Sequence, residues 1–543
     1  MQNNKKIVKP QDGLSGFLEH FTNDVSSGFL VFLIALPLSL GIAKASDFPP
    51  IMGLITAMIG GLVVSLFSGS LLTIKGPAAG LIVIVAGSVS DFGKGDAILG
   101  WQLALGALFV AGFVQILFGL IKMGSLADFF PLSAVHGMLA AIGIIIMSKQ
   151  IHVLLGVNPL YSNGRPMIDP ILLLRNLPAT ISKADVNAAI IGFVSLFVVL
   201  FWSKMPIGKF RKLPAPLVVL LLSIPLTKFL NVNPTQLIQF DQNLGDALNI
   251  NVRFNGIQQF GTFFQYVLMF ALVGSLESLL TVKAIDQLDP YQRKSNANKD
   301  LVAVGIGNMI CSVLGGLPMI AEVARSSANV NQGAKTRWSN FFHGVFVFVF
   351  LLTDIQFSGL IPYSALAAML IGVGIKLASP KELGRMAKIG PEQLLVFCVT
   401  IAVTLFTDLL IGISIGILVK LLSQFLLGVP LKSTFKANVV VSQAHVRITG
   451  AAVFSNWLGI KRSIDQFQPS DILTIDFSQC NVVDHTVMDH MIHLENEFHH
   501  AGGTLLILGL EQLTSVSASQ HPLSTRKRER ANRLDHFGNS MTR

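Results

Sequence analysis

Apolar segments recur along most of the chain and are separated by short polar stretches. They lie at about residues 27–45, 51–69, 77–90, 98–121, 129–150, 188–203 and 214–229 and, after a polar stretch near 230–260, at 262–281, 298–314, 317–330, 340–354, 360–378, 392–408 and 409–428. A helix needs about 20 residues to cross a bilayer, and most segments approach that length. The pattern predicts a polytopic α-helical membrane protein with about fourteen transmembrane segments, seven in each half.

The third segment of each half is short and is interrupted by glycine and proline, at residues 76–80 and 315–318. Non-helical backbone survives at membrane depth only where protein or a cavity covers it, and a helix that starts there points N–H groups and a partial positive charge inward. The matched pair favours a transporter with an anion site between the two helix starts, rather than two ordinary kinks. The predicted substrate-binding residues are Gly76, Pro77, Ala78, Ala79, Gly80, Pro318, Met319, Ile320, Ala321 and Arg325.

A carboxylate lies in the middle of the apolar segment 262–281. Placing Glu277 at the centre of a membrane helix costs roughly 2.5–3.5 kcal/mol, so such a residue usually faces a cavity and has a function. We predict that Glu277 binds a proton or a sodium ion and couples its gradient to substrate. Thr281 lies four residues on, on the same helical face, and is predicted to add a hydroxyl to the site. The alternative is a structural ion pair.

Two cationic residues lie beside the interruptions. Arg325 offers a planar donor fork that suits oxyanions, and Glu322, three residues earlier, is placed to hold it. The alternative is that Arg325 is simply paired with Glu322 and extends toward the membrane surface. Lys75, directly before the first interruption, either adds positive potential or is a loop lysine.

Composition and charge agree with a membrane protein. Only 13% of the 543 residues are charged, against about 25% in soluble domains, and the mean hydropathy is +0.63. The net charge of +10 does not indicate nucleic-acid binding, because the basic residues gather between apolar segments, where the positive-inside rule expects them. These clusters are Lys204, Lys209, Arg211 and Lys212; Lys283, Arg293, Lys294 and Lys299; and Lys376, Lys381, Arg385 and Lys388.

The same charge pattern predicts a multi-pass protein of the inner (plasma) membrane with a cytoplasmic N-terminal arm, residues 1–25. The expected outside segments 46–50 and 354–359 contain no Lys or Arg. The long outside loop at 151–186 is less clear, because it holds Arg165, Arg175 and Lys183. The transmembrane domain is predicted at residues 26–430.

After residue 430 the pattern changes to alternating strands and helices, which predicts a small α/β domain at 436–515. The expected elements are strands at 439–449, 471–477 and 503–509 and helices at 457–467 and 487–500. Residues 516–543 are predicted to be a basic, disordered tail. The histidines of the second helix, His490, His493, His499 and His500, are interpreted as a solvated face rather than a metal site.

We predict no enzymatic activity, because no nucleophile–base pair or set of metal ligands has a useful spacing. The three cysteines, Cys311, Cys398 and Cys480, are far apart and indicate neither disulfides nor a metal site. No cofactor is expected apart from a sodium ion that would serve coupling.

Together these features resemble the sulfate permease (SulP) family of anion transporters over about residues 20–515. The motifs that carry the resemblance are the Leu36-Pro37 step, the Gly76-Pro77 start, residues 277–281 and the segment 315–336. The resemblance implies a fold of seven-plus-seven inverted repeats, a core domain that moves against a gate domain, and a homodimer. Residues 78–80 are Ala-Ala-Gly where many members carry Thr or a second Pro, so this site would depend more on backbone N–H groups.

The C-terminal region is similar to a STAS domain, the usual partner of this family, through the pattern at 476–486. Thr486 lies near the phospho-acceptor position of related regulatory proteins, which makes it a candidate regulatory site.

The leading hypothesis is a secondary active transporter of sulfate or bicarbonate in the lipid bilayer, coupled to sodium or protons and working by alternating access. An uncoupled anion exchanger or an anion channel, a C4-dicarboxylate transporter, and a membrane sensor for the soluble domain remain open.

Overall fold

The fold is that of a computed structural model, which describes residues 9–161, 167–206, 213–238, 252–291, 293–353, 360–518 and 520–528. Several residues used above to predict orientation lie outside these ranges. They are Arg165, Lys209, Arg211, Lys212 and the segment 354–359.

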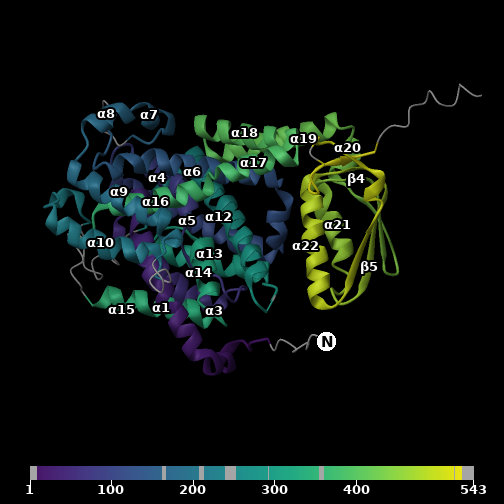
Figure 1. Cartoon of the computed structure of the whole chain (residues 1–543), viewed down its shortest axis with the longest axis horizontal. Coiled ribbons are helices and arrows are strands. Elements are labelled where there is room, and N and C mark those ends of the chain that lie inside the picture. Colours follow the sequence, from purple (N-terminus) through teal and green to yellow (C-terminus); the bar gives the residue numbers. More distant parts are fainter. Residues whose placement is uncertain are drawn as a thin grey trace, which may run out of the picture. The chain divides into compact units, whose positions relative to one another are not determined.

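Helices account for most of the first half of the chain (Figure 1). They are α1 Gly13–Ala45, α2 Pro50–Ile59, a π-helical turn Gly60–Val64, α3 Ser65–Phe67, a 3-10 turn Ala79–Leu81, α4 Ile82–Gly93, α5 Ala97–Leu120, a 3-10 helix Met123–Phe129, α6 Leu132–Leu154, α7 Pro170–Arg175, α8 Leu177–Ser182, α9 Val186–Phe201, a 3-10 turn Trp202–Lys204 and α10 Ala215–Phe229. The loop expected at 151–186 therefore contains two short helices, each of which has proline in its first turn.

The second half continues in the same way. Its helices are the 3-10 turns Pro234–Gln236 and Phe254–Gln258, then α12 Phe260–Leu288, α13 Ala297–Val313, α14 Val323–Asn331, α15 Trp338–Leu352, α16 Tyr363–Leu377, α17 Pro380–Ile389, α18 Pro391–Phe406 and α19 Leu409–Leu426. Each predicted apolar segment overlaps one of these helices, because the apolar pattern reports directly on the helices that must be covered by lipid or by one another.

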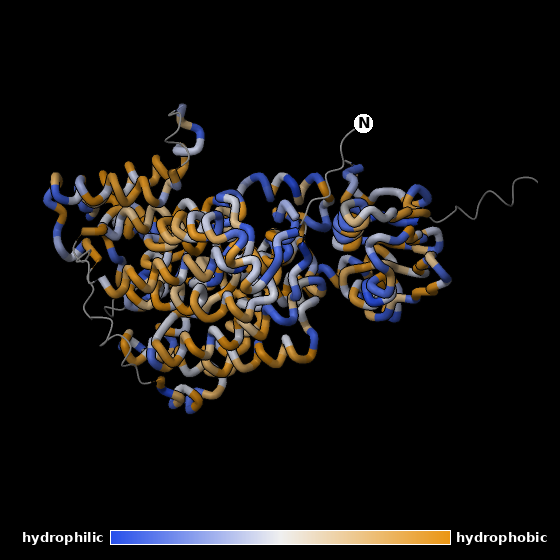
Figure 2. Tube along the Cα trace, turned by 90° about the horizontal axis from the view of Figure 1, so that it is seen from below, coloured by the Kyte–Doolittle hydropathy of each residue, from blue (hydrophilic) through white to orange (hydrophobic). Residues whose placement is uncertain are grey.

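Eight helices in the described part of the chain are long and apolar enough to cross a membrane. Four shorter apolar helices, Ala79–Gly93, Ala215–Phe229, Trp338–Leu352 and Pro391–Phe406, accompany them. Apolar residues dominate these helices, whereas polar residues alternate with apolar ones in the α/β region (Figure 2). The predicted helical membrane fold is confirmed.

The chain divides into two units, which we describe separately. The first comprises residues Met1–Ala127 and Leu139–Ala378, and the second comprises Asp128–Met138 and Ser379–Arg543. In the first unit α5, α12 and α13 pack against one another. Two short strands lie beside them: β2 (Met319–Ala321) packs against α12 and α13, and β1 (Lys75–Pro77) packs against α2 and pairs with β2. These strands are the two interruptions that the sequence pattern identifies.

The second unit contains the predicted α/β domain. Its sheet has the order β3-β4-β5-β8-β7, and β6 also pairs with β5. The strands are β3 Asn438–Ser442, β4 His445–Ala452, β5 Ile472–Val483, β6 Thr504–Leu508, β7 Thr514–Ser515 and β8 Arg526–Lys527. Helices α21 (Trp457–Ile464) and α22 (His485–Ala501) lie side by side against the sheet (Figure 1), where Trp457 stacks on His490 at 4.7 Å.

Two details of this region differ from the sequence prediction. The predicted domain end at residue 515 is too early, because β8 pairs antiparallel with β5 through Val482↔Lys527 and Val483↔Arg526. Residues 520–528 thus belong to the folded domain, and Arg528 donates to backbone oxygens of Ser478 and Cys480; residues 529–543 lie outside the described ranges. His490 faces Trp457 instead of forming part of a wholly solvated face, whereas His493 and His499 are exposed.

Candidate functional site

The two interrupted segments meet inside the first unit as a pair of short strands, and we call this strand pair and the two helix starts that follow it the crossing. β1 and β2 pair antiparallel, with Lys75 opposite Ala321, Gly76 opposite Ile320 and Pro77 opposite Met319. All residues of both strands are buried. The structure therefore brings together the two interruptions, more than 230 residues apart, and opposes them in the way that inverted halves require.

Each strand leads directly into a helix. Ala78 precedes the 3-10 turn Ala79–Leu81 and α4, and Glu322 precedes α14. No described side chain caps the first of these helix starts, whereas the Glu322 carboxylate accepts a hydrogen bond from Arg325 N at 2.7 Å at the second. Two helix starts thus point their N–H groups and partial positive charge into the crossing.

Polar side chains from α2, α5 and α13 hold the second strand and the residues that lead into it. Asn308 Oδ1 accepts from Met319 N at 2.7 Å, and Asn308 Nδ2 donates to Gln115 Oε1 at 2.7 Å. Thr56 Oγ1 accepts from Leu317 N at 2.8 Å. The sequence reasoning missed these residues, although each is a buried polar residue within an apolar segment and so carried a usable signal.

The turn before β2 depends on glycine. Gly315 has a φ of +81°, which favours glycine, and its carbonyl accepts from Trp101 Nε1 at 3.2 Å. A Cβ on Gly316 would lie 2.8 Å from Thr56 Oγ1, so the chain approaches α2 closely here. Both glycines therefore serve the geometry of the interruption.

Arg325 extends from α14 to the first strand. Its side chain is fully buried, its Nη2 donates to Pro77 O at 3.4 Å, and its Nη1 lies 2.6 Å from the position of a Cβ on Gly76. Its Nε and Nη1 have no hydrogen-bond partner within the described ranges. The alternative that Arg325 reaches the membrane surface is wrong, because the crossing encloses the whole side chain.

Glu277 lies against the start of the other helix. A Cβ on Gly80 would collide with both carboxylate oxygens of Glu277, so only glycine leaves room for them. Glu277 is 7% exposed, and its Oε1 has no hydrogen-bond partner among the described residues. Ser278 Oγ accepts from Ala321 N at 3.1 Å, and Thr281 is buried one turn further along α12. The structural ion pair considered for Glu277 is absent from the described part of the chain.

Lys75 has neither of the roles considered for it from the sequence. It is completely buried, and its Nζ lies 2.9 and 2.7 Å from the two carboxylate oxygens of Asp300 on α13. Asp300 also accepts from Ser68 Oγ at 2.6 Å. Because a carboxylate neutralises the ammonium, Lys75 anchors β1 instead of adding free positive potential.

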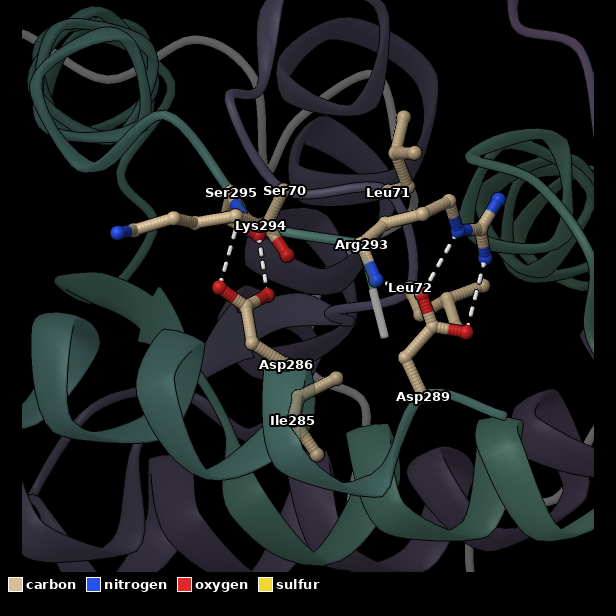
Figure 3. A pocket seen from close by; sticks show the side chains of 9 residues that line it. All are labelled: Ser70, Leu71, Leu72, Ile285, Asp286, Asp289, Arg293, Lys294 and Ser295. Carbon is tan, nitrogen blue, oxygen red and sulfur yellow. Dashed lines mark hydrogen bonds and ion pairs between the residues drawn. The ribbon is translucent and has the colours of Figure 1, made fainter. Parts of the chain in front are cut away.

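A separate small cavity lies where α12 meets the segment leading to α13 (Figure 3). Its volume of about 10 Å³ has room for a single water. Asp286 accepts from Ser295 N at 2.8 Å, and Asp289 forms an ion pair with Arg293 at 2.7 Å (Figure 3). Both carboxylates that line the cavity are thus paired with other lining residues, whereas Ser70 Oγ has no hydrogen-bond partner among the described residues. A cavity this small with two carboxylates in its wall is not the candidate substrate site.

In the second unit Thr486 is 1% exposed and its Oγ1 accepts from Leu132 N at 3.5 Å. Asp484 caps the same helix start through Val487 N at 3.0 Å. The Thr486 hydroxyl is not accessible to a kinase in this arrangement, so phosphorylation would require the domain to open. The regulatory role of Thr486 stays a prediction.

The geometry suits an inorganic anion. Buried donors converge on the crossing from Arg325 and from two helix starts, and charge-assisted hydrogen bonds of this kind are strong away from water. Within the described residues, no group of three or more His, Cys, Asp and Glu side chains is placed to hold a metal ion.

Comparisons with known proteins agree with this arrangement. The model of the sulfate permease family matches residues 21–400. YvdB of Bacillus subtilis (strain 168), whose name refers to sulfate transport, is 29% identical over 405 residues, or 74% of this chain and 73% of YvdB. The solved transmembrane domain of the bicarbonate transporter BicA from a cyanobacterium matches with a TM-score of 0.65 and 25% identity, over 73% of this chain and 98% of that domain.

A further structure extends the likeness to the α/β region. The murine Slc26a9 anion transporter in its inward-facing state matches with a TM-score of 0.63 over 93% of this chain and 90% of its own, at 14% identity, which concerns the fold alone. The predicted fold class is confirmed, and the sheet of the second unit is consistent with a STAS domain.

Proposed function

The chain belongs to the sulfate permease family, and from this premise we propose that it is a secondary active transporter of a small inorganic oxyanion, sulfate or bicarbonate. The observation that carries the proposal is the antiparallel crossing of β1 and β2, at which the buried guanidinium of Arg325 retains unpartnered N–H groups within the described structure. The family description supports sulfate, and the structural likeness to BicA supports bicarbonate.

The anion binds in this proposal between residues 76–80 and 318–321. Backbone N–H groups at the two helix starts and the fork of Arg325 supply its hydrogen bonds. All these residues are buried, so an anion would reach them only after neighbouring segments move. That burial supports alternating access, in which the elements around a fixed site move and open it to one side at a time.

Glu277 is the proposed coupling group, with Thr281 one turn away. When Glu277 and Glu322 are both ionised, they and Arg325 carry a net charge of −1, and an incoming anion meets net repulsion. A proton or a sodium ion on Glu277 removes that excess charge. Binding of the cation and binding of the anion would therefore favour each other, which is the requirement for symport.

Three further features are carried over as proposals. The basic residues between apolar segments support an N-terminus and α/β domain on the cytoplasmic side of the inner membrane. The homodimer rests on the family resemblance. The likeness to transporters supports a protein without enzymatic activity.

An uncoupled anion exchanger is the second candidate, because Arg325 and the two helix starts would serve it equally well. A simple anion channel is less compatible with Glu277, whose ionised carboxylate beside Gly80 would repel a passing anion. C4-dicarboxylates remain an alternative substrate class.

The test is uptake of labelled sulfate and of labelled bicarbonate into liposomes that contain the purified protein. Each anion is offered with an inward sodium gradient, an inward proton gradient or none. Accumulation of one anion under one gradient is expected and identifies both ions. Movement that only equilibrates in every condition would replace the symporter with the exchanger, and absence of flux with both anions would contradict oxyanion transport.

A further inference from the structure

Glu322 is fixed at the crossing by its own backbone and by its side chain. Its N–H donates to Ile74 O at 3.0 Å, and its carbonyl accepts from Ser326 N at 3.0 Å in the first turn of α14. Its carboxylate accepts from Arg325 N at 2.7 Å and lies 4.0 Å from Arg325 Nε. The side chain is 14% exposed, so this carboxylate is held almost entirely inside the protein.

The two helix starts at the crossing are therefore not equivalent. The start after Ala78 has no side-chain cap among the described residues, whereas the start of α14 already holds an anionic group. A free oxyanion bound at α14 would use the same donors, a backbone N–H of the first turn and the guanidinium of Arg325.

Stabilisation of the helix is an incomplete explanation for Glu322. Asn, Asp, Ser and Thr are the favoured N-cap residues, and this chain uses Asp96, Asp185 and Ser379 at other helix starts. Arg325 Nε and Nη1 remain without a hydrogen bond in the described part of the chain, although the Glu322 carboxylate is close to Nε. The carboxylate thus offsets the arginine charge without satisfying its donors, and it leaves room for a better ligand.

We propose that the Glu322 carboxylate is a tethered competitor of the transported anion, occupying the α14 start and facing Arg325 until the anion displaces it. The inference rests on the proposed function for the position of the substrate, and it assigns to Glu322 control over affinity. While the site is empty, the Glu322 carboxylate offsets the charge of the buried Arg325. It also sets a threshold, because an anion binds only when its own contacts exceed those that Glu322 gives up.

The direct test is the dissociation constant of labelled sulfate and of labelled bicarbonate, measured separately by equilibrium dialysis with purified protein. Glu322→Gln removes the charge and keeps a carbonyl oxygen that can accept from Arg325 N. Glu322→Ser places a favoured cap at the same position and covers the case in which the Gln variant fails to fold. We expect both variants to bind the transported anion at least tenfold more tightly than the wild type, about 1.4 kcal/mol in binding free energy.

The matched control is Asp96→Asn. Asp96 caps α5 through Leu99 N at 3.0 Å and is exposed, so this change also removes one N-cap charge but leaves the crossing intact. Equal or weaker binding in the Glu322 variants would overturn the proposal, and so would equal tightening in Asp96→Asn, which would indicate a general charge effect. Tighter binding without flux in liposomes would keep the competitor and reject the transporter, whereas no binding of either anion by any variant would reject both.

Discussion

The buried ion pair between Lys75 and Asp300 allows a quantitative test of how the first strand is held. The two side chains are 0% and 1% exposed, and Nζ lies 2.7 Å from Oδ2. At that distance, an effective dielectric constant of about 20 gives an attraction of about 6 kcal/mol as an upper limit. Removing one partner of a buried pair typically costs about 3–5 kcal/mol, because the other charge remains without compensation.

We expect Asp300→Asn to be the more damaging single change. It leaves the buried ammonium beside neutral acceptors, the new Asn carbonyl oxygen and Thr73 Oγ1 at 2.9 Å, whereas after Lys75→Met the Asp300 carboxylate keeps its bond from Ser68. The loss of unfolding free energy in the double variant should be smaller than the sum of the two single losses by at least about 2 kcal/mol. The free energy of unfolding is measured by titration with sodium dodecyl sulfate in mixed micelles.

The matched control uses the same substitutions at a partly exposed pair. Lys149 Nζ lies 3.1 Å from Asp47 Oδ2, with side chains 21% and 30% exposed, so Lys149→Met and Asp47→Asn should each cost no more than about 1 kcal/mol. The reasoning is refuted if Asp300→Asn costs as little as Asp47→Asn, or if the losses at Lys75 and Asp300 simply add.

Two further predictions concern other parts of the molecule. Gly80→Ala should displace the carboxylate of Glu277 and abolish gradient-driven accumulation of the anion in liposomes. Gly261→Ala lies on the same helix as Glu277, where a Cβ meets no atom within 4 Å, and should leave accumulation intact. Retained accumulation in Gly80→Ala would contradict the importance of this close contact. Burial lowers the pKa of His485 from 6.5 to about 4, so as the pH falls the unfolded domain takes up this proton before the folded domain does. The free energy of unfolding should therefore fall by about 3 kcal/mol between pH 6.5 and pH 4. His485→Asn, which can still donate to Leu523 O, should flatten that pH dependence in amide exchange of β4–β6 in the full chain, and an unchanged profile would reject the assignment.

The sequence was informative wherever a property is local. Continuous apolar stretches identify membrane helices, and glycine with proline marks where a helix cannot continue, so the sequence predicts both interruptions, although not that each contains a short strand. Arg325 and Glu277 were identified because a charge within an apolar stretch is costly and needs a reason. The burial of both side chains at the crossing agrees with those predictions, while their roles in binding and coupling stay proposals.

The sequence was less informative about partners that are distant along the chain. Asp300 follows Lys75 by 225 residues and Leu317 follows Thr56 by 261, so nothing local indicates either pairing. The end of the α/β domain was missed for a similar reason. β8 has two residues, too few for a strand pattern, and it exists through its pairing with β5.

The central claim is that the crossing binds the anion and that Glu277 links it to a cation. The most direct measurement compares wild type and Glu277→Gln for uptake of the transported anion into liposomes, with and without the driving gradient. The account predicts that the wild type concentrates the anion only under the gradient, while Glu277→Gln carries it no further than equilibrium. Accumulation by Glu277→Gln at the level of the wild type would contradict the coupling role of Glu277.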